Sequence, residues 1–93
     1  MTKADIVNRV AYKTDIEKLH VSKTIEALMD VIKDSLGKGE NAYLRGFGTF
    51  EVKKRAEKKA RNISKNTTVI IPAHNIPFFK PSKNFTEKVK KQL

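Results

Sequence analysis

The spacing of the apolar residues changes at one point in this chain, at the glycine pair Gly37 and Gly39. Before it, large apolar residues recur every three or four positions, at Val21, Ile25, Leu28, Met29, Ile32 and Leu36. That spacing puts them on one face of a helix, which the two glycines end. After it, Thr49–Lys53 alternates apolar and polar residues, as a half-buried strand does. The chain is therefore predicted to be α+β, with helices first and strands second.

A shorter helix is expected to precede the long one. Thr2 is followed three residues later by Asp5, a capping pattern for a helix start. The helix should end near Lys13 or Thr14, and Asp15 is a candidate N-cap for the long helix. Because the first helix already begins at Thr2, no signal segment is expected before it, and a cytoplasmic protein is the simplest interpretation.

The segment after Val52 is strand-like but has nothing to bury. From Lys54 to Arg61 its apolar residues are alanines, so the strand should project into solvent. It can pair with the β-prone segment Thr67–Ile71 across a tip near residues 62–66, where Asn66 can take the left-handed conformation. Two later prolines, Pro72 and Pro77, favour an edge position or bulges in the returning strand.

These patterns predict a single domain over residues 1–93. Residues 1–39 form a helical base, 40–81 a three-stranded antiparallel sheet with a long protruding β-hairpin arm at about 54–71, and 82–93 a short C-terminal helix capped by Ser82. So short a chain buries only roughly 60% of its unfolded surface. Dimerisation would enlarge the core.

Charge is distributed unevenly between these parts. Residues 1–52 carry as many acids as bases, residues 53–66 carry a net charge of +6, residues 67–79 carry no Asp, Glu, Lys or Arg, and residues 80–93 carry +4. Such segregation indicates a surface that meets a polyanion, and most of that surface lies on the predicted arm.

Several classes of site are not expected. The chain has no cysteine, which removes disulfides and thiolate metal sites, and no apolar run approaches the ~20 residues of a membrane span. His20 and His74 have no partners at metal-ligand spacing, and Asp30 with Asp34 is better explained as a solvated helix face than as a nuclease site. We therefore predict no catalytic residues, metal, cofactor, small-molecule substrate or membrane association.

Several short motifs together identify a family. They are Gly46-Phe47-Gly48-Thr49-Phe50, a basic tract, Ala60-Arg61-Asn62, Ile71-Pro72 and Pro77-Phe78-Phe79-Lys80. Over essentially the whole chain the sequence resembles the HU and integration-host-factor family of bacterial DNA-bending proteins, itself a standard example of minor-groove architectural proteins. The resemblance implies an intertwined dimer, a homodimer in the simplest case and otherwise a heterodimer, whose two arms enter the minor groove of nucleoid DNA.

The resemblance also implies site residues. Members of the family usually carry Arg-Asn-Pro at the arm tip, where the proline wedges between base pairs. Here Ile63 takes the place of that proline and is the expected intercalating residue. The expected DNA contacts are Lys3, Arg45, Lys53, Arg55, Lys58, Lys59, Arg61, Asn62, Ile63, Lys65, Lys80 and Lys83. The expected dimer core is Leu28, Met29, Ile32, Leu36, Leu44, Phe47, Phe50 and Phe79.

The predicted function is to bind double-stranded DNA with little sequence preference and to bend and compact it. One alternative is a sequence-specific regulator of the integration-host-factor type. Another is an RNA-binding structural protein, which would usually expose aromatic side chains for base stacking, whereas the residues of this arm include none. A nucleic-acid enzyme is the weakest alternative, because no acidic or nucleophilic residues converge.

Overall fold

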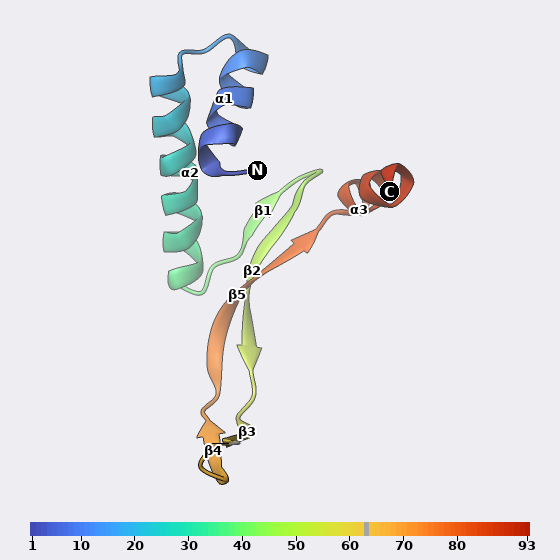
Figure 1. Cartoon of the computed structure of the whole chain (residues 1–93). Helices are drawn as coiled ribbons and strands as arrows, with labels where there is room; N and C mark the ends of the chain where they lie inside the picture. The colour runs from blue at the N-terminus through green and yellow to red at the C-terminus, as the bar shows by residue number, and fades with distance from the viewer. Residues whose placement is uncertain (63) are drawn as a thin grey trace. The chain divides into compact units, whose positions relative to one another are not determined.

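The computed structural model describes residues 1–62 and 64–93. Three helices and five strands follow one another along the described chain (Figure 1). They are α1 (Lys3–Thr14), α2 (Lys18–Gly37), β1 (Ala42–Leu44), β2 (Gly48–Arg55), β3 (Lys58–Asn62), β4 (Thr67–Ile71), β5 (His74–Pro81) and α3 (Lys83–Gln92). The predicted α+β class is confirmed. The chain divides into two compact units, Met1–Ser35 and Leu36–Leu93, each described by itself below.

The start of α1 follows the predicted capping pattern. The Thr2 hydroxyl accepts from the Asp5 N–H at 3.2 Å, and the Asp5 carboxylate accepts from the Thr2 N–H at 2.9 Å. The bond from the Thr2 backbone is the main reason that the pKa of Asp5 lies below its usual value. At the other end, Asp15 takes a left-handed conformation with φ 61° and ends α1. The prediction that Asp15 caps α2 is therefore wrong, since α2 begins only at Lys18.

The apolar stripe of α2 is only partly covered in the single chain. Val21 is buried, Ile25 and Met29 are half-buried, and Leu28 is 48% exposed. Among the described residues, no large side chain is fully buried, and Ala11 and Val21 make up the buried apolar core. The helix ends at Gly37 as predicted. Among the described residues, part of this apolar face therefore stays open to solvent.

The second unit is organised around an antiparallel sheet in the order β1-β2-β5. Residues 45–47 form the tight connection between β1 and β2, where Gly46 has φ 83° and the Phe47 N–H donates to the Leu44 carbonyl at 2.9 Å. Strand β5 lies at the edge, which accommodates Pro77 within it, as predicted.

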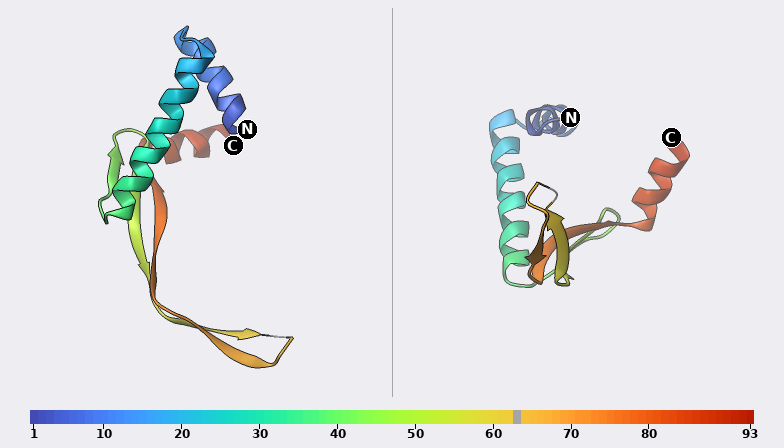
Figure 2. Two further views of the ribbon diagram at one scale, coloured as in Figure 1. Left: turned by 90° about the vertical axis from the view of Figure 1, so that its left-hand side faces the viewer. Right: turned by 60° about the horizontal axis from the view of Figure 1, so that its bottom comes forward.

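The arm differs from the prediction of one hairpin protruding from a three-stranded sheet. Pairing of β2 with β5 stops at Arg55 and His74, and a separate two-stranded sheet of β3 and β4 resumes at Lys58 and Ile71. Figure 2 shows the ribbon bending where one ladder gives way to the next. Pro72 lies in this gap, and because it has no N–H and a fixed φ it cannot continue the ladder.

An aromatic cluster joins the sheet to α3. The Phe79 ring lies 4.8 Å from Phe50 and 5.1 Å from Phe47, and Phe85 of α3 stacks on Phe47 at 5.3 Å, all between ring centroids. Ser82 caps α3 as predicted, since its hydroxyl accepts from the Phe85 N–H at 3.2 Å and also donates to the Gly46 carbonyl at 2.9 Å. The cluster is open on one side, because Phe47 is 46% exposed.

Gly48 is the tightest point of the cluster. A Cβ built on it would lie 2.6 Å from both the Lys80 carbonyl oxygen and the Phe79 ring. We expect Gly48→Ala to reduce the free energy of unfolding by roughly 1–3 kcal/mol through overpacking, measured by thermal melting at fixed protein concentration. Gly37→Ala is the matched control, because nothing lies within 4 Å of its Cβ. Equal melting temperatures for the two variants would contradict the close packing at Gly48.

Candidate nucleic-acid interface

The cations predicted to meet DNA lie exposed along the arm and its base. Lys53 and Arg55 belong to β2, Lys58, Lys59 and Arg61 belong to β3, and Lys65 lies in the turn after it. Every one of these six side chains is exposed. Glu57 is the one acid between Lys53 and Asn66. Neither ion pair found among the described residues involves an arm residue, so within this part of the chain the arm cations form no ion pairs.

Side-chain hydrogen bonds organise the described part of the arm tip. The Arg61 guanidinium donates through Nη2 to the Asn66 side-chain oxygen, and Asn66 has the predicted left-handed conformation with φ 51°. The Asn62 oxygen accepts from the Ser64 N–H at 3.2 Å and from its hydroxyl at 2.8 Å. Asn62 and Arg61 are thus held in place at the end of β3. The predicted wedge, Ile63, lies outside the described residues.

A second basic group lies at the other end of the sheet. Arg45, Lys80 and Lys83 come from the β1–β2 turn, β5 and the start of α3, and all three line one shallow hollow. Tyr43 and Thr49 also line this hollow, so a phenol and a hydroxyl group share it with the cations. The structure therefore brings Arg45 together with Lys80 and Lys83, which lie far from it in the sequence.

Lys3 has a different environment from the other predicted contacts. Its ammonium forms an ion pair with Glu26 inside the helical unit. The hydrogen bond from Lys3, followed by its charge, lowers the pKa of Glu26. Unlike the arm cations, Lys3 already has an anionic partner, which makes it a weaker candidate for a phosphate contact.

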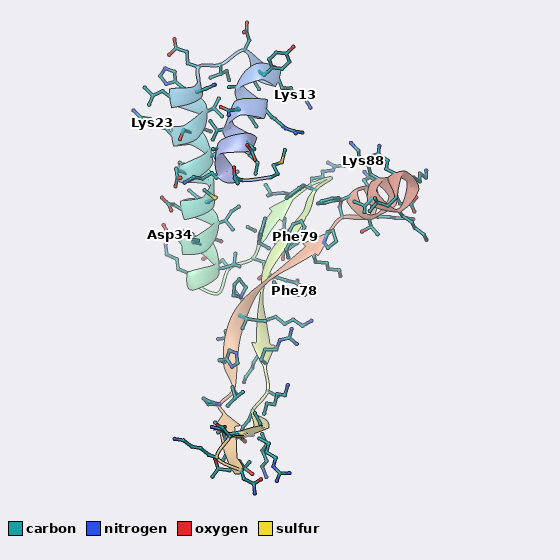
Figure 3. All side chains as sticks on the ribbon, in the orientation of Figure 1. Lys13, Lys23, Asp34, Phe78, Phe79 and Lys88 are labelled. Carbon is teal, nitrogen blue, oxygen red and sulfur yellow. The ribbon has the colours of Figure 1, made fainter. Side chains whose placement is uncertain are left out.

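Sequence reasoning missed one member of the site, Phe78. The Lys53 ammonium lies 4.4 Å from the centre of the Phe78 ring. Figure 3 labels Phe78 and its neighbour Phe79 on β5. Phe79 is paired with Phe50 and lies in the aromatic cluster, whereas Phe78 is paired with Glu51 and takes the opposite face. The signal was present in the sequence, because Lys53 and Phe78 both fall on the outward phase of their strands.

The two histidines, His20 and His74, each lie near one polar partner. Among the described residues, no three His, Cys, Asp or Glu side chains gather as metal ligands would. His20 lies 3.8 Å from Glu17, and the His74 Nδ1 lies 3.0 Å from the Pro72 carbonyl oxygen. Within the same part of the chain, no helix has the length and hydropathy to cross a membrane.

Comparisons with known proteins agree in placing the chain among bacterial DNA-binding proteins. A family model described as "Bacterial DNA-binding protein" matches residues 1–90. The DNA-binding protein HU of Staphylococcus aureus is 40% identical over 90 residues, which is 97% of this chain and 100% of that protein. HU of Thermotoga maritima is 39% identical with the same coverage. A cocrystal structure of Anabaena HU with DNA has a TM-score of 0.92 at 34% identity, covering 96% of this chain and 97% of that one.

Proposed function

Because the chain belongs to the family of bacterial DNA-binding proteins that includes HU, we propose that it is an architectural protein of the nucleoid. It binds double-stranded DNA with little sequence preference, and bends and compacts it. Its role is structural rather than catalytic. The observation that carries the proposal is the arm, whose exposed cations have no acidic partner among the described residues. The likeness to a chain crystallised with DNA supports the same function.

The two basic groups fit successive stretches of one duplex. The hollow lined by Arg45, Lys80 and Lys83 receives backbone phosphates at the sheet, and the arm cations follow the backbone into the minor groove. At the tip, Arg61 and Asn62 reach base edges that distinguish little more than A·T from G·C pairs. Weak sequence preference follows from that poor information content, and it disfavours the site-specific alternative.

The apolar surface supports a homodimer. The proposed core consists of Leu28, Met29, Ile32, Leu36, Leu44, Phe47, Phe50 and Phe79. None of these side chains is buried in the single chain, and Leu28 and Phe47 are about half exposed. A second copy of the chain would cover them, and it would also supply the second arm that encloses the duplex.

Ile63 is the proposed kinking element. It follows Arg61 and Asn62 at the position of the family's proline, and an apolar side chain inserted between base steps unstacks them at a cost of a few kcal/mol per step. Ile63→Ala should keep most of the affinity, which comes from phosphate contacts, but reduce bending. The measurement is the energy-transfer efficiency between dyes at the two ends of a random-sequence duplex.

The design separates the wedge from the rest of the site. The Ile63→Pro variant should bend DNA at least as well as the natural chain, and Thr68→Ala, at an exposed position on β4, is the control. Unchanged bending by Ile63→Ala would contradict the wedge. Competition with duplex RNA and with a selected DNA site tests the alternative partners, since either one winning by a large factor would overturn low-specificity DNA binding.

A further inference from the structure

The outward face of the sheet carries a cation, a carboxylate and an aromatic ring side by side. Glu51 and Lys53 are two residues apart on β2, and therefore project to the same face. Phe78 lies directly opposite Glu51 on β5, and Ile76 lies opposite Lys53. Lys53 is thus within reach of two competing partners, the Glu51 carboxylate along its own strand and the Phe78 ring across the ladder.

The ring holds the cation. The Lys53 ammonium lies over Phe78, 4.4 Å from the ring centre, within the range of a cation–π interaction. In the part of the chain that the structure describes, Lys53 and Glu51 do not form an ion pair. Phe78 is half-buried while Lys53 is exposed, so the ring is a fixed support and the ammonium remains open to solvent on its other side.

The two partners would affect DNA binding in opposite ways. A carboxylate neutralises the ammonium and would have to be released before a phosphate could bind. A ring attracts the ammonium through its quadrupole and carries no net charge. A lysine held by the ring therefore keeps its full charge, and its side chain gives up less conformational freedom when a phosphate arrives.

We propose that Phe78 is a positioning residue for DNA binding: it holds Lys53 away from Glu51 and presents the ammonium to a backbone phosphate. The inference rests on the proposed function, because it takes Lys53 to be a phosphate contact. It adds a residue that carries no charge and touches no phosphate itself, and it gives the outward ring of β5 a role distinct from that of Phe79 in the aromatic cluster.

The test is the salt dependence of DNA binding. The slope of log K against log salt becomes shallower by about 0.9 for each phosphate that the protein no longer neutralises, or by about 1.8 when both arms of a dimer are affected. Phe78→Leu keeps an apolar side chain but removes the ring, so Lys53 should turn to Glu51 and the slope should become shallower by up to that amount. Adding Glu51→Gln to Phe78→Leu should restore the slope, because the competing carboxylate is then gone.

Each outcome decides between explanations. If Phe78 had only a structural role, Phe78→Leu would lower the melting temperature without changing the slope, and adding Glu51→Gln would not affect the slope. Either observation would overturn the inference. Lys53→Met by itself should make the slope shallower. Adding Phe78→Leu to Lys53→Met should change the slope no further. If Lys53→Met leaves the slope unchanged, Lys53 is not a phosphate contact and the inference fails, whereas DNA binding by the natural chain would still stand.

A second measurement uses the natural protein and therefore does not depend on whether a variant folds. In the natural protein, the ring current of Phe78 should shift the Lys53 side-chain protons next to the ammonium upfield in an NMR spectrum. Lys54, the neighbour on the opposite phase of β2, provides the reference within the same molecule. Identical shifts for the two lysines would overturn the placement of Lys53 over the ring.

Discussion

DNA binding should weaken about 10³–10⁵-fold when salt rises from 50 to 200 mM, if 6–10 phosphates are contacted. The reason is that each arm cation that meets a phosphate releases a condensed counterion, and added salt opposes this release. The structure makes this effect large, since the arm cations are exposed and have no acidic partner among the described residues. The measurement is the dissociation constant of a fluorescent duplex over a series of salt concentrations.

Matched variants show which charges contribute. Lys58→Gln removes one cation from β3 and should make the slope shallower by about 0.9 for each copy that contacts a phosphate. Lys23→Gln removes the same charge from α2 and should change the slope much less, because no contact is proposed there. An affinity that does not depend on salt would rule out the electrostatic mechanism.

Removing the Phe79 ring should cause the largest loss of stability. The ring lies within 5.1 Å of Phe47 and Phe50 and within 6.2 Å of Phe85, between centroids. We expect Phe79→Ala to reduce the free energy of unfolding by about 3–5 kcal/mol, since it opens a cavity where several side chains meet. Each kcal/mol corresponds to roughly 4–8 °C in melting temperature for a domain of this size.

The control for Phe79 is Tyr12, whose side chain is 92% exposed. Tyr12→Ala should change stability by no more than about 0.5 kcal/mol. Melting should be followed at several protein concentrations, because a dimer melts at a higher temperature when the protomer concentration rises. A loss below about 1 kcal/mol for Phe79→Ala would contradict a central role of the cluster in the core.

Local signals predicted the helices well and the arm less well. The capping pattern at Thr2 and the cap at Ser82 each depend on a few neighbouring residues, and both are confirmed. Asp15 was misassigned because a short polar residue suits both the start and the end of a helix, and the left-handed turn after α1 decides between them. The break in the arm depends on how Pro72 falls within the register of two strands, which no local pattern specifies.

The candidate site shows the same division. Charge segregation already indicated the basic arm, and the lack of large apolar residues in this strand predicted that Lys58, Lys59 and Arg61 are exposed. The family resemblance added Lys3, although Glu26 on the second helix pairs with it. Neither the charge pattern nor the resemblance indicated Phe78, since an aromatic residue in a strand is expected in the core. Partners that come from distant segments cannot be deduced from composition.

The sequence by itself determined the α+β class, the basic arm and the kind of partner, because periodicity and charge are properties of the chain that survive any arrangement of its elements. Only the tertiary structure decided which cations are free. Pairing of β2 with β5 put Phe78 beside Lys53, and folding of the helical unit gave Lys3 an acidic neighbour. Electrostatic and cation–π interactions act over a few ångströms, so register and packing decide whether a charge remains available for DNA.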